Sequence, residues 1–156
     1  MTVACWRIAA EAPEYAANDL SGTGARITGG RWNNKDQPLV YSASNIALAI
    51  LETVHSLRSG PLPFNRYLVR IDIPDAIWHA RLRLDPLPGG WDAIPAGATA
   101  REVGDAWIAA QASAVLLVPS VIVPDECNVL INPQHPGAAA ISSVSVRRWI
   151  FDPRFF

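Results

Sequence analysis

The sequence is poor in cysteine and in lysine. Cys5 and Cys127 are the only cysteines among 156 residues, and Lys35 is the single lysine beside twelve arginines. The two cysteines form no CxxC pair, so they do not make a zinc site, and the sequence leaves open whether they form a disulfide. His55, His79 and His135 show no metal-ligand spacing either. We therefore expect no metal.

The chain also has no excess of positive or of negative charge. Charged residues make up 17% of the chain, with thirteen basic against fourteen acidic residues and a net charge of -1. No run of five or more Lys or Arg residues occurs. Affinity for nucleic acid rests on a basic surface, so we expect no direct nucleic-acid contact.

Long hydrophobic runs are absent too. No apolar stretch approaches the roughly 18 residues that a membrane-spanning helix needs. The first fifteen residues have neither the basic start nor the apolar centre of a signal peptide. We expect a soluble cytoplasmic protein without membrane contact. Half of the residues are hydrophobic, which favours one domain over residues 1–156 with a sizeable core.

The hydrophobic pattern predicts many strands and two helices. Residues 65–73 alternate strictly between apolar and polar side chains, which is typical of a half-buried strand. The Pro- and Gly-rich residues 84–98 should form a long loop. Because the strands and helices are grouped rather than strictly alternating, the expected fold class is α+β. The other expected strands are 3–9, 38–43, 114–124 (bent at Pro119), 128–133 and 145–151, and the expected helices are 45–58 and 99–113.

Both helices carry residues that favour a particular start. Ser42 or Ser44 can cap the first helix, and Thr99 with Glu102 forms a capping box for the second. The first helix should end near Gly60 and the prolines that follow. The expected buried stripe of the second helix consists of Val103, Ala106, Trp107 and Ala110.

Residues 29–55 hold the side chains that bear most on chemistry. Glu52 lies on a helix that is apolar almost all the way round, so it shares or borders the buried face, where a carboxylate needs hydrogen-bond partners. A position on the solvent side is an equally good interpretation of the spacing alone. The glycine-rich segment 21–30 matches neither GxGxxG nor GxxxxGK, which excludes a dinucleotide-binding fingerprint and a P-loop.

Arg31 and Tyr41 complete this set. Arg31 follows two glycines that permit close approach of a ligand, and its guanidinium could bind a phosphate. Tyr41 ends a short strand, where its ring could stack on a flat heterocycle while its hydroxyl stays in water. Taken singly, an exposed turn arginine and a core tyrosine are the favoured interpretations.

The block GARITGGRWNNKDQPLVYSASNIALAILETVH resembles the signature of the RES-domain family, the toxin halves of bacterial RES–Xre toxin–antitoxin pairs. CWRI resembles the first strand of that family, and LVPSVIVPDECNVLINPQHP resembles its C-terminal block. The resemblance implies one RES domain with a split β-sheet core and flanking helices, similar to ADP-ribosyltransferases. It also implies an enzyme that consumes NAD as its substrate. Its partner would be an Xre-like helix-turn-helix antitoxin, and toxins of the family form homodimers in such complexes.

The resemblance assigns roles to named residues. Arg31, Tyr41 and Glu52 match the Arg, Tyr and Glu of the family and would be catalytic. Glu52 would stabilise positive charge on the ribose, Tyr41 would stack on nicotinamide, and Arg31 would hold the phosphate or ribose region. Further NAD contacts are predicted for Arg7, Ser120 and Asn128.

Three functions follow from these residues. The leading hypothesis is an NAD glycohydrolase or phosphorylase that cleaves the nicotinamide–ribose bond. An alternative is a protein ADP-ribosyltransferase, because the same three residues serve both reactions and the acceptor decides between them. A second alternative is a non-catalytic module that binds a ligand or partner, which would hold if the three residues lay far apart.

Overall fold

In the part of the chain that the structure describes, seven strands form one mixed sheet in the order β4-β5-β6-β2-β1-β3-β7. The computed structural model describes residues 1–57 and 63–155. All neighbouring strands are antiparallel except β4 and β5. The strands are β1 (Thr2–Ala10), β2 (Val40–Ala43), β3 (Arg66–Pro74), β4 (Leu82–Arg83), β5 (Val115–Pro119), β6 (Cys127–Ile131) and β7 (Ser142–Arg148).

Four α-helices and two short 3₁₀ helices accompany the sheet within these two described ranges. They are α1 (Thr23–Thr28), α2 (Ile46–Ser56), α3 (Asp75–His79), α4 (Ala98–Ala110), η1 (Pro136–Ala140) and η2 (Pro153–Phe155). The α+β class is thus confirmed, as are the long loop before α4 and the alternating faces of β3. The short helices α1 and α3 and the short strand β4 were not predicted. The predicted end of the first helix near Gly60 lies outside the described residues.

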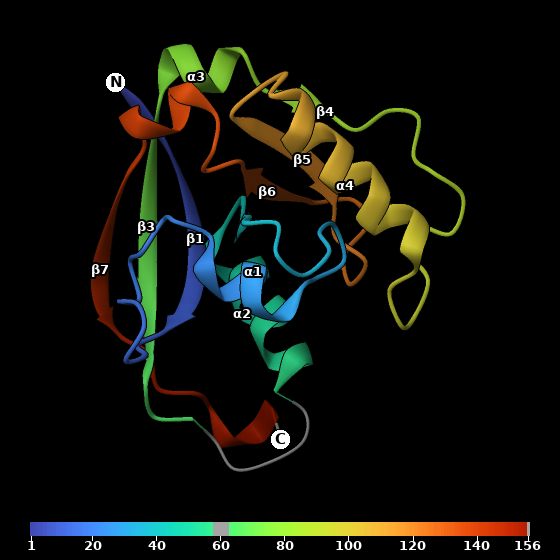
Figure 1. Ribbon diagram of the computed structural model, residues 1–156. Helices are drawn as coiled ribbons and strands as arrows, with labels where there is room; N and C mark the ends of the chain where they lie inside the picture. The colour runs from blue at the N-terminus through green and yellow to red at the C-terminus, as the bar shows by residue number, and fades with distance from the viewer. Residues whose placement is uncertain (58–62, 156) are drawn as a thin grey trace.

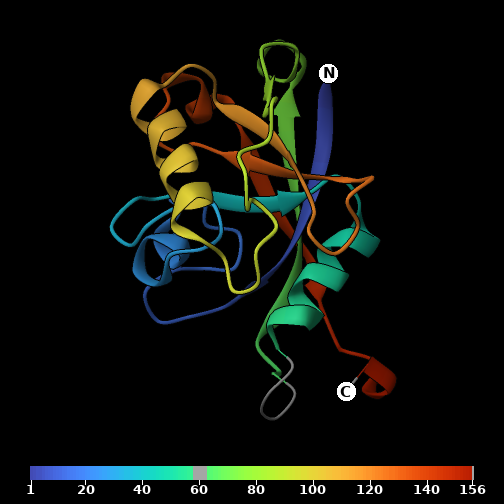
Figure 2. The same ribbon diagram turned by 90° about the vertical axis from the view of Figure 1, so that its right-hand side faces the viewer.

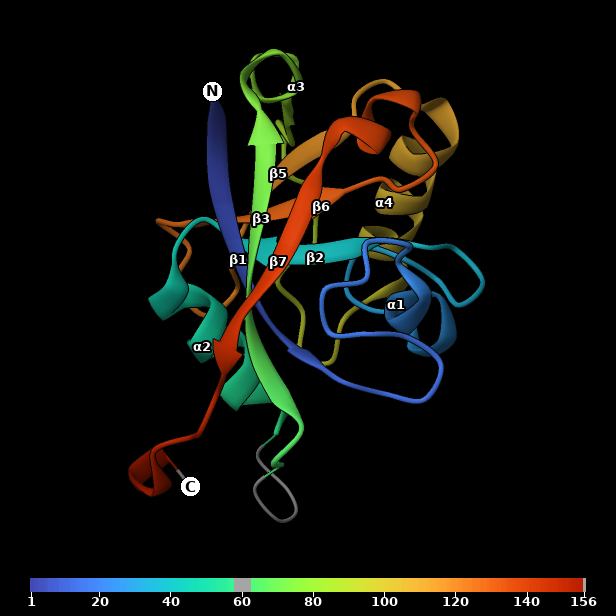
Figure 3. The same ribbon diagram turned by 90° about the vertical axis from the view of Figure 1, so that its left-hand side faces the viewer.

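The strands of this one sheet fall into two groups that run in different directions (Figure 1; Figure 3). β1, β3 and β7 run alongside one another, whereas β2, β5 and β6 cross them at a steep angle (Figure 1; Figure 3). A single register pair, Trp6 with Ala43, joins β1 to β2 at the crossing. The predicted split β core is confirmed, and the crossing opens an angle in which the segments after β1 and before β2 lie.

Each long helix covers a different part of the sheet (Figure 2). Leu48 and Ala49 of α2 pack with Ile8, Ala43 and Leu68 from the three strands at the crossing. The α4 helix covers β5 and β6 through a separate cluster. That cluster consists of Trp32, Leu39, Ala100, Trp107, Ile108, Leu116, Val118 and Leu130. The core therefore fixes both helices against the rim of the split.

The two predicted helix caps are wrong. The side chain of Asn45, not that of Ser42 or Ser44, accepts the backbone N–H of Leu48 at 2.8 Å. The Ser42 hydroxyl is instead buried and donates to the carbonyl of Val129. The helix α4 begins after Gly97 without a side-chain cap, two residues too early for Thr99 to serve as one.

The buried face of α4 also differs from the predicted stripe. Trp107 is buried and Val103 is partly buried, but Ala106 and Ala110 are exposed. The helix is turned so that Ala100, Gly104, Trp107 and Ile108 face inward. Gly104 explains the rotation, because its missing side chain lets the helix rest directly on the backbone of Trp32.

The strand predicted for residues 114–124 ends at Pro119. The hydroxyl of Ser120 accepts the backbone N–H groups of Ile122 and Val123, both at 3.1 Å, and so turns the chain back toward β6. The last strand likewise ends earlier than predicted, at Arg148. In the part of the chain that the structure describes, no helix has the length and apolar character needed to cross a membrane.

Candidate active site

A cavity of about 1030 Å³ lies at the split of the sheet. Its lining comes from β1, the 15–31 segment, β2, α2 and the start of β6. Five of the six predicted site residues line it: Arg7, Arg31, Tyr41, Glu52 and Asn128. Side chains that are up to 121 residues apart in the sequence, from Arg7 to Asn128, therefore share one hollow.

Glu52 lies on the cavity side of α2. Its Oε1 accepts the hydroxyl of Ser120 at 2.6 Å and the side-chain amide of Asn128 at 2.9 Å. The exposed stripe of this helix runs through Ala47 and His55, so Glu52 lies next to that stripe rather than on it. Of the two interpretations of its spacing, the half-buried one with hydrogen-bond partners is correct.

Ser120 does not line the cavity but holds Glu52 from behind. Ser120 begins the turn after β5. Its hydroxyl oxygen accepts hydrogen bonds from two backbone N–H groups, which leaves Glu52 as the acceptor of its own proton. Because three partners surround one oxygen, the hydroxyl proton points at the carboxylate. Ser120 thus contributes to the site by positioning Glu52.

The prediction that the Tyr41 hydroxyl stays in water is wrong. This hydroxyl donates to Oδ1 of Asn33 at 2.6 Å and accepts the backbone N–H of Trp32 at 2.9 Å. Burial raises the pKa of the Tyr41 phenol, and the bond from Trp32 offsets only part of that rise. Tyr41 therefore ties the strand β2 to the loop that carries Arg31, and only its ring remains to meet a ligand.

Replacing Tyr41 with Phe tests whether the hydroxyl holds the loop while the ring is left for the ligand. The ring stays, but Trp32 N–H and Asn33 Oδ1 each lose a partner, so we expect a loss of about 1–3 kcal/mol in the free energy of unfolding. Urea denaturation measures that loss. Tyr67, which is partly buried on β3, provides the control, because its side chain makes no recorded hydrogen bond to the described residues. Equal stability of Tyr41→Phe and Tyr67→Phe would contradict the tying role of the hydroxyl.

Two glycines shape the loop before Arg31. Gly29 has a φ of 70°, a left-handed conformation that glycine adopts without strain. A Cβ on Gly30 would lie 2.6 Å from the Tyr41 hydroxyl. The glycine pair thus permits both the turn and the close approach of the loop to Tyr41, and a larger residue at either position would displace Arg31.

The guanidinium of Arg31 is held by the long loop before α4. One of its nitrogens, Nη1, donates to the carbonyls of Trp91 and Ala93 at 2.9 and 2.8 Å. These acceptors are neutral, so the positive charge of Arg31 is oriented at the cavity wall without a carboxylate. Nothing in the sequence of the 84–98 loop indicated this contact.

Among the described residues, two buried polar atoms at the cavity have no hydrogen-bond partner: Nε of Arg7 and Oδ1 of Asn128. Burial lowers the pKa of Arg7, while nearby Asp19 and Tyr15 oppose that change. Buried polar atoms are rarely left unpaired, so both atoms indicate that the cavity takes a polar ligand. Arg7 lines the cavity, and its role as a second anion contact stays a prediction.

Sequence reasoning gave no role to Asn33, which lies beside this cavity without lining it, or to several residues that do line it. Asn33 is fully buried and donates to three backbone carbonyls while accepting from Tyr41. Its place in the Gly-Arg-Trp-Asn block was the one signal of this role. Tyr15, Asp19, His55 and Arg66 line the cavity, and no motif marked them.

The two cysteines have different surroundings. Cys5 is buried, its Sγ accepts the Ser42 hydroxyl, and burial raises the pKa of its thiol to about 11. Cys127 is partly exposed, and both thiols are free. Among the described residues, no three His, Cys, Asp or Glu side chains are grouped so that they could hold a metal ion.

Comparison with known proteins identifies the class of this chain. Residues 4–153 match the model of the RES domain. The chain therefore belongs to the RES-domain family, as the block around Arg31, Tyr41 and Glu52 indicated.

Its curated relatives are toxins of that family. The chain is 54% identical over 156 residues to the "Prs ADP-ribosylating toxin" of Sphingobium sp., covering 99% of this chain and 97% of the relative. It is 38% identical over 141 residues to "Toxin Res" of Yersinia enterocolitica, covering 90% and 92% of the two chains. For "Toxin Res" of Pseudomonas putida the identity is 37% over 153 residues, with 97% and 98% covered.

The fold has a counterpart among solved structures. The crystal structure of the MbcT–MbcA toxin–antitoxin complex of M. tuberculosis contains a chain that superposes with a TM-score of 0.63. The match covers 94% of this chain and 85% of that one at 20% sequence identity. At this identity the likeness concerns the fold alone.

Proposed function

We propose that this RES-domain toxin is an enzyme that cleaves the nicotinamide–ribose bond of NAD. The observation that carries the proposal is that Arg31, Tyr41 and Glu52 line one cavity, with the Glu52 carboxylate held by two donors. The alternative of a non-catalytic module required these residues to lie far apart. The unpaired buried atoms of Arg7 and Asn128 add support, because NAD offers both anionic and hydroxyl groups.

The chemistry follows from charge. When the bond breaks, its electron pair moves onto the nicotinamide nitrogen, and the ribose carbon becomes oxocarbenium-like. The Glu52 carboxylate stabilises that positive charge and orients a ribose hydroxyl. The Tyr41 ring packs against nicotinamide, while Arg31 and Arg7 hold the anionic part of NAD. A lone pair of the acceptor then forms the new bond at the ribose carbon, and the acceptor's proton passes to solvent.

The acceptor distinguishes the two enzymatic hypotheses. Water or phosphate as acceptor makes a glycohydrolase or phosphorylase, which the sequence favoured. The name of the relative at 54% identity instead supports transfer of ADP-ribose to a protein, Prs in its case. We propose Prs as a candidate acceptor of this toxin as well.

One assay tests both parts. Purified toxin is mixed with NAD alone, with NAD and phosphate, and with NAD and Prs, and nicotinamide release is followed. We expect release in at least one mixture, and a mass gain on Prs corresponding to ADP-ribose if protein is the acceptor. Intact NAD in all three mixtures would refute NAD cleavage. Release without a mass gain on Prs would restrict the reaction to water or phosphate.

A partner is also proposed. The structural neighbour was solved as a toxin–antitoxin complex, which supports an antitoxin for this toxin. We propose an Xre-like helix-turn-helix antitoxin, with the toxin as a homodimer in a cytoplasmic complex. Light scattering of the purified complex measures its stoichiometry, and a single toxin copy per complex would refute the homodimer.

A further inference from the structure

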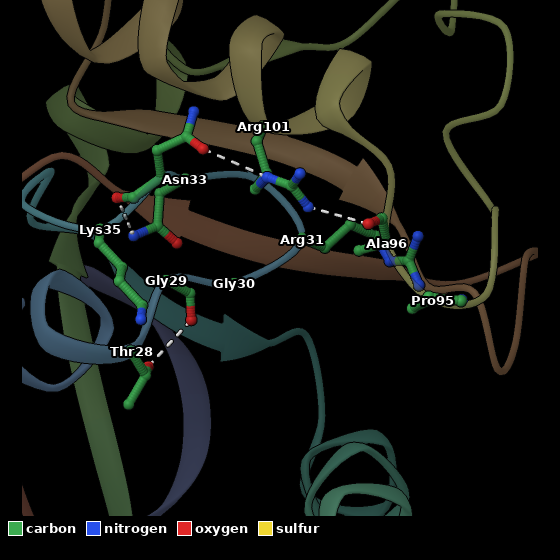
Figure 4. Close-up of a pocket in the computed structure, with 10 residues that line it drawn as sticks. Thr28, Gly29, Gly30, Arg31, Asn33, Lys35, Pro95, Ala96 and Arg101 are labelled. Carbon is green, nitrogen blue, oxygen red and sulfur yellow. Dashed lines mark hydrogen bonds between the residues drawn. The ribbon is translucent and has the colours of Figure 1, made fainter.

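The cavity of about 1030 Å³, in which we propose that NAD binds, is called the NAD cavity below. A second hollow of about 660 Å³ adjoins it at Arg31. It lies between the loop of Gly29 and Gly30, the start of α4 and the end of the long loop (Figure 4). Six residues are common to both hollows: Thr28, Gly29, Gly30, Arg31, Pro95 and Ala96. Asn33, Asn34, Lys35 and Arg101 line the second hollow but not the NAD cavity. We name this second hollow the Lys35–Arg101 pocket.

The charge of the Lys35–Arg101 pocket is of one sign. Its lining includes Arg31, Lys35 and Arg101 and no carboxylate. The guanidinium of Arg101 donates to Oδ1 of Asn34 at 3.2 Å and to the carbonyl of Ala96 at 2.8 Å. Both guanidinium groups are thus oriented by neutral oxygens.

Among the residues that the structure describes, none of the three cations belongs to a recorded ion pair. Within the described residues, salt bridges join only Arg70 to Asp72 and Arg154 to Asp152. The closest carboxylate in the hydrogen-bond network, that of Asp105, binds the backbone and side-chain amides of Asn34. Arg31 and Arg101, which neutral oxygens orient, and the exposed Lys35 beside them repel one another unless an anion joins them.

The size of the pocket indicates the kind of anion. A volume of about 660 Å³ is many times the roughly 30 Å³ that one water molecule occupies, so several side chains can enter together. A single small ion would leave most of it empty. The single lysine of the chain, Lys35, is exposed at its rim, where it can meet a surface that approaches from solvent.

We propose that the Lys35–Arg101 pocket binds acidic side chains of the protein that accepts ADP-ribose. This inference rests on the proposed NAD cleavage and adds the place and chemistry of acceptor docking. Because the pocket shares Arg31 with the NAD cavity, a segment docked there lies beside the bound NAD. The carboxylates of the acceptor protein bind in the pocket. The side chain that is modified then reaches the ribose of NAD where the two hollows adjoin.

Lys35→Glu is the sharpest test. Lys35 does not line the NAD cavity, and its side chain makes no recorded hydrogen bond to any described residue. NAD cleavage in the absence of an acceptor protein should therefore stay within twofold. Transfer to Prs should fall about tenfold or more, because attraction becomes repulsion. Arg154→Glu, with the same charge change in the terminal 3₁₀ helix, should change neither rate.

A binding measurement tests the pocket without relying on catalysis. A fluorescent hexaglutamate peptide should bind the wild-type protein, more tightly at about 25 mM than at about 300 mM salt. It should bind Lys35→Glu about tenfold more weakly. A hexaglutamine peptide should not bind.

The outcomes separate the two proposals. Peptide binding that is equal in wild type and Lys35→Glu would overturn the docking site. Displacement of the peptide by millimolar phosphate, together with unchanged transfer to Prs in Lys35→Glu, would assign the pocket to a small anion and also overturn it. Absence of NAD cleavage in every variant, with peptide binding intact, would instead refute the proposed enzyme.

Discussion

Glu52→Gln is expected to lower the turnover of NAD about 100-fold or more while leaving the fold intact. The amide keeps the size of the side chain, and its carbonyl oxygen can still accept from Ser120 and Asn128. What is lost is the negative charge that opposes the developing positive charge on the ribose. Removal of one electrostatic group of this kind costs about 10²–10³ in rate. Nicotinamide release under saturating NAD measures the effect.

Glu102→Gln is the matched control. Glu102 is exposed on α4 and does not line the cavity, so the same chemical change should leave turnover unchanged. Thermal unfolding of both variants should match the wild type within a few degrees. If Glu52→Gln turned over NAD within severalfold of Glu102→Gln, the electrostatic role of Glu52 would be wrong.

Gly104→Ala is expected to have the largest effect on stability. A Cβ at this position would lie 1.7 Å from the backbone oxygen of Trp32, closer than any real contact. Neither side can give way without moving α4 or the loop that follows Arg31. Overpacking typically costs about 1–3 kcal/mol, and this case should reach at least about 3 because the clash is with backbone. Urea denaturation measures the loss.

Gly89→Ala separates this clash from the general effect of adding a methyl group. Nothing lies within 4 Å of a Cβ at Gly89, so the variant should stay within about 1 kcal/mol of the wild type. Any Gly104→Ala protein that folds should also lose NAD turnover, since displacement of Trp32 shifts its neighbour Arg31. Equal denaturation midpoints for the two variants would show that α4 does not rest on the Trp32 backbone as described.

The local pattern of the chain predicted most of the regular structure. Strict alternation marked β3, and the apolar run before Pro119 marked β5, because burial of one or both faces imposes those patterns. Helix caps were less predictable. Ser42 and Ser44 suit a cap as well as Asn45 does, and the choice depends on the Ser42 hydroxyl, which is used by Val129, 87 residues away.

For the candidate site, too, the sequence predicted some features and not others. The order of Arg31, Tyr41 and Glu52 in one block identified the candidate residues. The block did not indicate that the Tyr41 hydroxyl is buried against Asn33 or that Arg31 is held by the carbonyls of Trp91 and Ala93. The orientation of α4 escaped prediction for a related reason, because Gly104 contributes by lacking a side chain.

The sequence by itself determined the family, the α+β class and the residues from which the candidate site is built. These depend on residue type, order and periodicity, which are written in the chain. Only the tertiary structure decided that Arg7, Arg31, Tyr41, Glu52 and Asn128 line one cavity and that Lys35 and Arg101 share the pocket beside it. The physical reason is that these juxtapositions come from the crossing of β1 and β2 and from the packing of α4 on Trp32. Both are set by contacts between residues far apart in the sequence.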